Sequence, residues 1–212
     1  MGEMEKIREK CGIMEVYIKE NVLSKEDLEY LKKRADEIKD QSTPENSAST
    51  TRIKYDTRSD ERASKIFMKA FINKDVYNET KKFYDYAWRS FNDRLCTEFE
   101  CAITRYGKNG YYAWHIDHTG PNRRTLNIII YLNTPDGGEI EISTDYLKPT
   151  KKTIPLDRKI PNPEMVIKPK ENMMVIFPAQ YPHVVKSVNS GYRIIIHGHT
   201  LICKSELDLS NG

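Results

Sequence analysis

The chain has 212 residues, enough for one domain with a substantial hydrophobic core. Its 34 lysines and arginines against 31 aspartates and glutamates give a formal charge of +3, which is too balanced to indicate a nucleic-acid-binding protein. No stretch is long and apolar enough to span a membrane, the first residues are charged, and the four cysteines show no paired metal-binding spacing, so we expect a reduced, cytoplasmic protein.

The first half of the sequence predicts one strand followed by helices. Apolar and polar residues alternate around Val16, as in a half-buried strand. Ser24 with Asp27 three residues later is typical of a helix N-cap with its capping-box partner, and a helical apolar pattern then continues to Ile38. Two more helices are expected near 63–70 and 84–95, whose aromatic stripes indicate core packing, and the polar stretch 41–51 is expected to be a loop.

From residue 97 onward the apolar period changes from helical spacing to two. Strands are expected near 99–103, 126–132, 173–177 and 194–196. Helices followed by many strands indicate an α+β arrangement in which the helices support a β-sandwich or jelly roll.

Two histidines and an aspartate are the strongest candidates for a metal site. On an extended strand, His115 and Asp117 would point to the same face. A second imidazole from His183 would complete the two-histidine, one-carboxylate set that binds Fe(II) and leaves coordination positions open. A structural zinc site would instead use four protein ligands, so this set indicates a catalytic metal.

The surroundings of His183 strengthen this interpretation, since a His-x-Asp tripeptide is common by chance. His183 follows the apolar run 173–177 and the turn 178–182, and Arg193 opens a second apolar run after the turn residues 189–191. We expect the strand of His183 and the strand of Arg193 to pair as a hairpin. A buried arginine is costly without an anion, so Arg193 indicates an anion-binding position.

Three segments resemble a known family: YGKNGYYAWHID (106–117), RTLNIIIYLNTPDGGE (124–139) and VIFPAQYPHVVKSVNSGYR (175–193). They resemble the Fe(II)- and 2-oxoglutarate-dependent dioxygenases, specifically the prolyl 4-hydroxylase-like group. The resemblance covers the chain from about Phe99, and the N-terminal half is only loosely similar. It implies a double-stranded β-helix (jelly roll) over 97–204, supported by an N-terminal strand and helices in 1–96 that pack on it, with 205–212 as a tail.

The resemblance also implies roles for particular residues. His115, Asp117 and His183 correspond to the iron ligands and form the catalytic set. Arg193 corresponds to the residue that holds the distal 5-carboxylate of 2-oxoglutarate, for which a guanidinium is suited because it can form two parallel charge-assisted hydrogen bonds.

Three further residues match positions near the co-substrate or substrate. Tyr131 corresponds to a tyrosine whose hydroxyl shares the distal carboxylate, and Tyr106 to one near the keto-acid end of the co-substrate. Arg124 lies where related peptide hydroxylases contact their substrate, although an arginine at the start of a strand is also often solvated surface.

The sequence departs from the family at His199, where an aromatic residue usually lies six positions after the basic anchor. By strand parity, Arg193, Ile195, His197 and His199 share one face, and we interpret His199 as a hydrogen-bonded supporting or core histidine and not as a metal ligand. Nucleic-acid demethylases of the superfamily usually have a second arginine at this position, so its absence argues against a nucleic-acid demethylase. His118 is expected at the surface or in a lid.

We therefore expect a hydroxylase that uses Fe(II), 2-oxoglutarate and O2, with ascorbate as reductant, and that releases succinate and CO2. Asp117 is retained where related halogenases have a small residue, which favours hydroxylation over halogenation. The resemblance to the prolyl 4-hydroxylase-like group implies that the substrate is a prolyl residue of a peptide or protein. The alternatives are a dioxygenase that acts on a free amino acid, another side chain or a nucleobase, and a non-catalytic jelly-roll binding module. The basic, proline-rich stretch 143–169 is either a flap over the substrate or a hairpin tip without catalytic importance.

Overall fold

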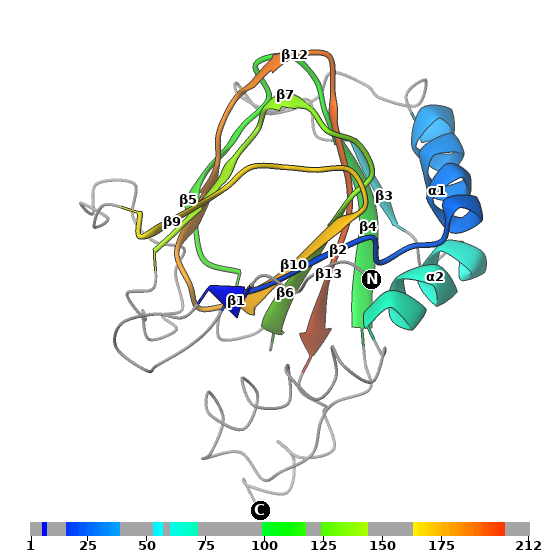
Figure 1. The fold of residues 1–212 in the computed structure, drawn as a ribbon, viewed down its shortest axis with the longest axis horizontal. Helices are drawn as coiled ribbons and strands as arrows, with labels where there is room; N and C mark the ends of the chain where they lie inside the picture. The colour runs from blue at the N-terminus through cyan, green and yellow to red at the C-terminus, as the bar shows by residue number, and fades with distance from the viewer. Residues whose placement is uncertain are drawn as a thin grey trace, which may run out of the picture.

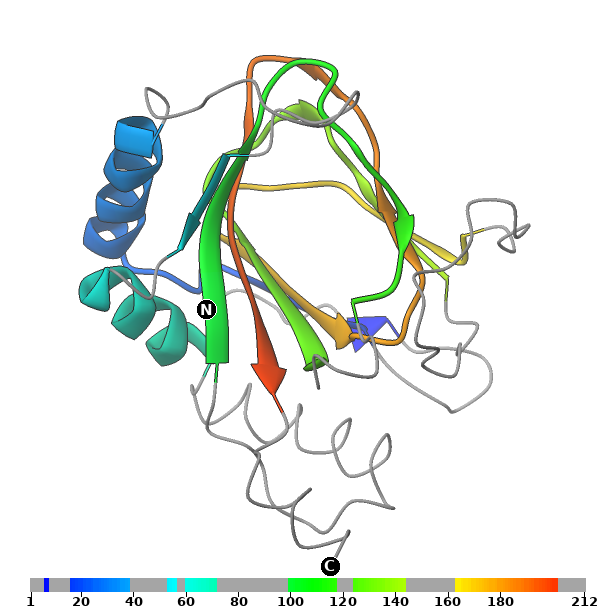
Figure 2. The same cartoon turned by 180° about the vertical axis from the view of Figure 1, so that it is seen from behind.

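The structure is a computed structural model that describes residues 6–7, 16–38, 53–56, 60–71, 99–117, 124–143 and 163–201. In these ranges the chain forms two helices on the outside of a β-sheet core, as Figures 1 and 2 show from opposite sides. The predicted α+β fold with a jelly-roll core is confirmed.

A seven-stranded sheet forms the wall of the core next to the helices. Its strand order is β1-β2-β10-β6-β13-β4-β3, and the pairs are antiparallel. The strands span Lys6–Ile7 (β1), Val16–Glu20 (β2), Ile53–Asp56 (β3), Phe99–Tyr106 (β4), Arg124–Tyr131 (β6), Met173–Pro178 (β10) and Arg193–Leu201 (β13).

A four-stranded sheet lies opposite, in the order β5-β11-β8-β9. Its strands span Tyr112–His115 (β5), Ile140–Ile142 (β8), Met165–Ile167 (β9) and His183–Val185 (β11). A short pair, β7 (Asp136–Gly137) with β12 (Val188–Ser190), lies at the top of the molecule in Figure 1, where the two larger sheets approach each other.

Helices α1 (Lys25–Ile38) and α2 (Glu61–Phe71) pack side by side on the outer face of the large sheet (Figure 1). The backbone N–H of Asp27 donates to Ser24 Oγ at 3.1 Å, which confirms the predicted N-cap of α1. Asp60 caps α2 by accepting from the N–H of Ala63 at 3.0 Å, and it also accepts from Tyr30 and Arg34 of α1. One buried carboxylate therefore connects the two helices.

Helix α2 comes close to the large sheet because β13 has a glycine at the contact. A Cβ atom at Gly198 would lie 2.3 Å from the carbonyl oxygen of Glu100 and 2.7 Å from the ring of Phe67. The buried face of α2 contains Ala63, Ile66, Phe67, Ala70 and Phe71, with the helical spacing that the sequence predicted.

The predicted strands around Val16 and in the second half of the chain are all present. The expected hairpin between the strands of His183 and Arg193 is wrong, because β11 pairs with β5 and β8, whereas β13 pairs with β4 and β6 of the other sheet. The predicted helix at 84–95 and loop at 41–51 lie outside the described residues, as do His118 and residues 144–162 of the proposed flap. The end of that flap region instead forms β9, which pairs with β8.

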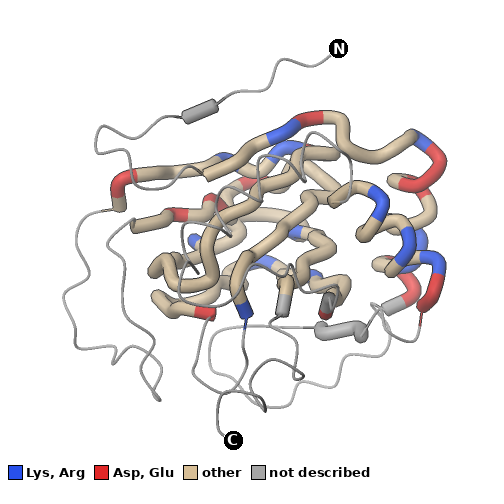
Figure 3. Tube along the Cα trace, turned by 90° about the horizontal axis from the view of Figure 1, so that it is seen from below, with Lys and Arg blue, Asp and Glu red and all other residues tan. Residues whose placement is uncertain are grey.

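Figure 3 shows Lys and Arg interspersed with Asp and Glu along the described parts of the chain, most densely where the two helices lie. This distribution agrees with the small formal charge of the sequence. Neither of the two described helices has the length and apolar character needed to cross a membrane.

Candidate active site

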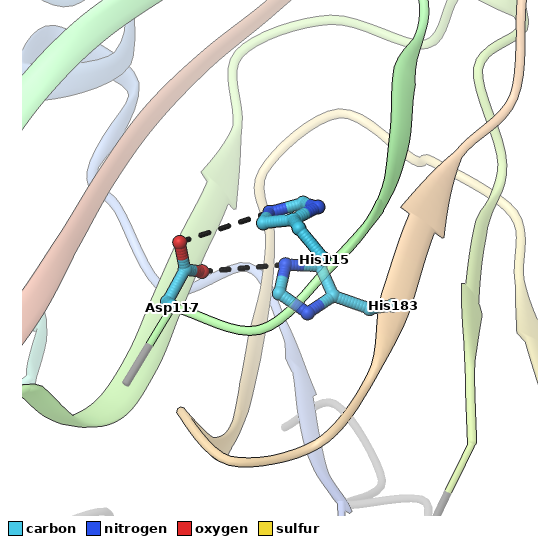
Figure 4. A group of neighbouring side chains, drawn as sticks. All are labelled: His115, Asp117 and His183. Carbon is cyan, nitrogen blue, oxygen red and sulfur yellow. Dashed lines mark ion pairs between the residues drawn. The ribbon is translucent and has the colours of Figure 1, made fainter. Parts of the chain in front are cut away.

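His115, Asp117 and His183 converge at one end of the smaller sheet (Figure 4). His183 opens β11 and is paired directly with His115 at the end of β5, and their ring centroids are 4.0 Å apart. His115 Nε2 lies 3.7 Å from Asp117 Oδ1, and His183 Nε2 lies 3.3 Å from Asp117 Oδ2. One ligand atom from each residue lies within 4.8 Å of the others, so the three side chains can share one metal ion.

Asp117 reaches this position from beyond the end of β5 and not from within a strand. Its backbone N–H donates to the carbonyl oxygen of Ala179 at 3.0 Å, which fixes the turn that follows the strand. Burial opposes ionisation of its carboxyl group, but the imidazoles of His115 and His183 outweigh burial and hold its pKa well below its usual range. Asp117 is therefore an ionised carboxylate ready to bind a cation.

Backbone contacts orient both imidazoles for metal binding. His115 Nδ1 lies 2.8 Å from the carbonyl oxygen of Ala113, and His183 Nδ1 lies 2.9 Å from that of Tyr181. A carbonyl oxygen only accepts, so each Nδ1 carries a proton, and Nε2 is the ring nitrogen available to a metal. Both Nε2 atoms face Asp117, which is the arrangement that a metal site of this kind needs.

Arg193 is a buried arginine whose charge has no hydrogen-bonded counterion among the described residues. It is 1% exposed, and its Nε, Nη1 and Nη2 atoms have no hydrogen-bond partner there. The buried Tyr131 hydroxyl likewise has no hydrogen-bond partner within the described part of the chain, and the ring centroids of Tyr106 and Tyr131 lie 4.9 and 5.4 Å from the guanidinium carbon. Burial raises the pKa of Tyr131, although the charge of Arg193 opposes this effect.

Backbone geometry makes room for this arginine. Gly138 has a φ of +73°, and a Cβ atom there would lie 2.9 Å from Arg193 Cδ. Glycine therefore meets both requirements at this turn, the left-handed backbone and the close approach of the arginine.

A cavity of about 240 Å³ joins the metal-ligand cluster to Arg193, and Tyr131 is not among the described residues that line it. Its walls include the three candidate metal ligands, Arg193 and Tyr106. A ligand that binds a metal at the triad can therefore extend toward the guanidinium within one cavity.

The remaining predicted residues lie near the same cavity. Arg124 also lines it, donates through Nε to Glu100, and has Nη1 3.6 Å from Asp117 Oδ1, so it is not an isolated surface arginine. The parity prediction for β13 is confirmed, since Arg193, Ile195, His197 and His199 all line the cavity. His199 is 6% exposed and hydrogen-bonded through Nδ1 to Asn127 Oδ1 at 2.7 Å, and it is outside the metal-ligand cluster found among the described residues.

The sequence analysis missed several cavity residues. Tyr112 and Phe177 pack edge-on against His115 and His183, with ring centroids 4.0 and 4.9 Å away. Asn127 and Glu100 also line the cavity. Strand parity places Asn127 on the same face as Tyr131, and Glu100 on the same face as Tyr106, but parity alone does not say which face lines the cavity.

Residues 101–200 match the model of the 2OG-Fe(II) oxygenase superfamily. No curated protein is similar in sequence at a significant level. The structure is similar to that of a Pseudomonas putida prolyl-4-hydroxylase, with a TM-score of 0.60, 15% identity, and coverage of 89% of this chain and 92% of that one.

Two further prolyl hydroxylase structures are similar. One is from Trichoplax adhaerens, in complex with a hypoxia inducible factor oxygen degradation domain peptide fragment (TM-score 0.59, 18% identity, 92% of this chain and 86% of that one). The other is a viral collagen prolyl hydroxylase from Paramecium Bursaria Chlorella virus-1, in complex with 2OG (TM-score 0.54, 18% identity, 89% and 96%). Residues 101–200 therefore form a 2OG-Fe(II) oxygenase domain, and the chain has a prolyl 4-hydroxylase-like fold.

Proposed function

We propose that this protein is a 2-oxoglutarate- and O2-dependent hydroxylase that acts on a prolyl residue of a peptide or protein. Its superfamily implies Fe(II), 2-oxoglutarate and O2. When bound, these supply oxidative decarboxylation of 2-oxoglutarate to succinate and CO2, coupled to hydroxylation of a substrate C–H bond. Ascorbate is the proposed reductant.

The donor set of the candidate site fits Fe(II). His115, His183 and Asp117 offer two neutral imidazole nitrogens and one carboxylate, the ligand types of a non-haem iron site with open positions. The carbonyl oxygens of Ala113 and Tyr181 keep the imidazoles in the required tautomer before any metal arrives. We assign these three side chains as the iron ligands and the catalytic set.

The observation that carries the proposal is the buried guanidinium of Arg193, which has no hydrogen-bond partner among the described residues. A buried charge without a partner is costly, so the cavity is suited to an anion at this point. The distal carboxylate of 2-oxoglutarate supplies it, with the Tyr131 hydroxyl as a second donor. Tyr106, whose ring faces Arg193 in the same cavity, is assigned to the wall around the co-substrate.

The prolyl substrate is supported by the fold, because the similar structures include prolyl hydroxylases and one of them contains a peptide. Arg124, on the cavity wall beside Asp117, is the proposed substrate contact. Other candidate substrates are a free amino acid, another side chain or a nucleobase. A buried arginine without a hydrogen-bond partner and a metal-ligand set in the same cavity are not expected in a non-catalytic binding module.

The first test is the turnover of 2-oxoglutarate to succinate by purified protein with Fe(II) and ascorbate. His115→Ala and Asp117→Ala are each expected to abolish this turnover and to weaken Mn(II) binding, measured by electron paramagnetic resonance without any reaction. Undiminished turnover in both variants would disprove the assignment of the ligands.

Asp136→Asn is the matched control, because Asp136 is another carboxylate whose pKa is lowered, by hydrogen bonds from Asn189 and Ser190 at the end of the molecule occupied by β7 and β12. It should keep both turnover and Mn(II) binding. Incubation with candidate proteomes, followed by mass spectrometry for hydroxyproline, tests the substrate. Hydroxylation found only on other residues would replace the prolyl assignment.

A further inference from the structure

A row of polar side chains crosses the large sheet on its cavity face. His199 of β13 is paired directly with Glu100 of β4 on one side and with Asn127 of β6 on the other. All three side chains line the cavity that contains the candidate iron ligands. Three neighbouring strands thus present polar groups to the same cavity.

The hydrogen bond between His199 and Asn127 has a fixed direction. Asn127 Oδ1 can only accept, so His199 Nδ1, 2.7 Å away, must carry the proton. Burial lowers the pKa of His199 to about 4, so the ring is neutral at pH 7. A neutral ring protonated at Nδ1 has a lone pair at Nε2, and Glu100 Oε1 is 3.9 Å from that nitrogen, beyond hydrogen-bond distance.

Asn127 contributes a hydrogen-bond donor, in contrast to the acceptor on His199. It is 2% exposed, and its Nδ2 amide nitrogen has no partner among the described residues. Native structures rarely leave such a donor buried without an acceptor. This wall of the cavity therefore offers an acceptor, His199 Nε2, beside an unsatisfied donor, Asn127 Nδ2.

The one acidic residue of the row, Glu100, is paired with a neighbouring arginine. Glu100 accepts from Arg124 Nε, and Arg124 Nη1 also lies 3.6 Å from Asp117 Oδ1. A second charge brought beside this ion pair would lose its hydration without gaining a counterion. The hydrogen-bonding wall is thus suited to a neutral polar group with a donor and an acceptor side by side.

We infer that Asn127 and His199 form a specificity subsite for a side-chain carboxamide of the peptide substrate, that is, an asparagine or glutamine next to the residue at the iron. The carboxamide oxygen accepts from Asn127 Nδ2, and its N–H donates to His199 Nε2. This inference rests on the proposed function, since it names a feature of the substrate of the same site. Binding of the substrate would satisfy the buried donor that the described residues leave without a partner.

The test is peptide binding, measured by fluorescence anisotropy with the full chain, Mn(II) and 2-oxoglutarate under anaerobic conditions. The probes are labelled peptides with one proline, in which each flanking position carries Asn, Gln, Leu, Ser, Asp or Lys in turn. Asn or Gln at one position is expected to bind about tenfold more tightly than Leu or Asp, the ratio that one or two buried hydrogen bonds supply. A preference for an apolar, hydroxyl or charged residue in the wild-type protein overturns the inference.

Substitutions then test whether Asn127 and His199 cause the preference for a carboxamide. His199→Phe and Asn127→Leu should each remove it, whereas His199→Gln should keep it, because a glutamine amide can also donate to Asn127 Oδ1 and accept from the substrate. His197→Phe is the matched control on the same strand face, where the ring is bonded to Thr104, and should leave the ranking of the peptides unchanged. Equal loss of the preference in the His197 and His199 variants would show that general packing, not this subsite, sets it.

A single-stranded oligonucleotide serves as competitor, because a nucleobase edge presents a similar donor and acceptor. Tighter binding of the oligonucleotide than of every peptide, lost in His199→Phe, would also overturn the peptide assignment. Different experimental outcomes would reject the subsite and the proposed function. Turnover of 2-oxoglutarate without a carboxamide preference rejects only the subsite, and a carboxamide preference without turnover rejects only the hydroxylase.

Discussion

At the scale of single residues, Arg193 and Arg105 show how differently two buried arginines of one sheet can be used. Arg105 is on the face of β4 toward the helices, where it pairs with Asp36 and stacks on the Tyr192 ring with its guanidinium carbon 3.5 Å from the centroid. Arg193, on the cavity face of β13, has aromatic rings nearby but no anion among the described residues. The charge of Arg105 is balanced by Asp36 within the protein, whereas the charge of Arg193 requires an anionic ligand.

This contrast predicts the cost of removing each side chain. Arg193→Met should raise the KM for 2-oxoglutarate about 100-fold, because it removes two charge-assisted hydrogen bonds, and Tyr131→Phe should raise it about tenfold through the loss of one. Arg105→Met, the matched control, should leave that KM unchanged even if it lowers stability. Succinate formation over a range of 2-oxoglutarate concentrations measures all three, and an unaltered KM in Arg193→Met would refute the assigned anchor.

At the scale of secondary-structure elements, Asp60 holds α1 and α2 together on the sheet. Burial opposes its ionisation, but hydrogen bonds from the Ala63 N–H, Arg34 and Tyr30 outweigh this and lower the pKa of its carboxyl. A lowered folded-state pKa means that this carboxylate contributes stability above its unfolded pKa of about 4 and that the contribution is lost as the pH falls toward its folded pKa.

We therefore predict that Asp60→Asn lowers the free energy of unfolding by about 1–3 kcal/mol at pH 7, and by less at pH 3, where the wild-type carboxylate is itself being protonated. Urea denaturation of both proteins at the two pH values measures the difference. Glu61→Gln is the control, since Glu61 is exposed and pairs only with Lys65 of its own helix among the described residues. An effect of Asp60→Asn that did not depend on pH would argue against the ionised carboxylate as the link.

At the scale of the whole molecule, local pattern predicted the elements but not all of their partners. The strands, the cap of α1 and the shared face of β13 depend on spacing within one segment, which the sequence displays directly. The pairing of His115 with His183 joins distant segments, and the expected hairpin of the His183 and Arg193 strands was wrong because β12 and a turn lead the chain from one sheet into the other. The division at residues 96 and 204 stays a prediction.

The same topology explains which candidate residues could be found. His115, Asp117, His183 and Arg193 were recognisable because their residue types are costly or rare in such positions and their spacing resembles a known family. Asn127 and Glu100 were missed because parity gives only the shared face of a strand, and which face lines a cavity depends on how the sheets close. Their partner His199 was correctly predicted to be a hydrogen-bonded residue, but its bond to Asn127 crosses between strands and has no local signal.

The arrangement of the two sheets predicts how ligands stabilise the molecule. Two of the candidate iron ligands are on strands of the smaller sheet and Arg193 is on the large sheet, so a metal with bound 2-oxoglutarate would connect both walls. At concentrations of about 100 times the dissociation constant, binding adds about 2.7 kcal/mol, or about 5–10 °C in Tm for a chain of this size. Mn(II) alone should stabilise the wild type and Arg193→Met alike, and 2-oxoglutarate should add a further rise only with the metal and only in the wild type. Differential scanning calorimetry measures these shifts. A rise with 2-oxoglutarate that needed neither the metal nor Arg193 would place its binding elsewhere.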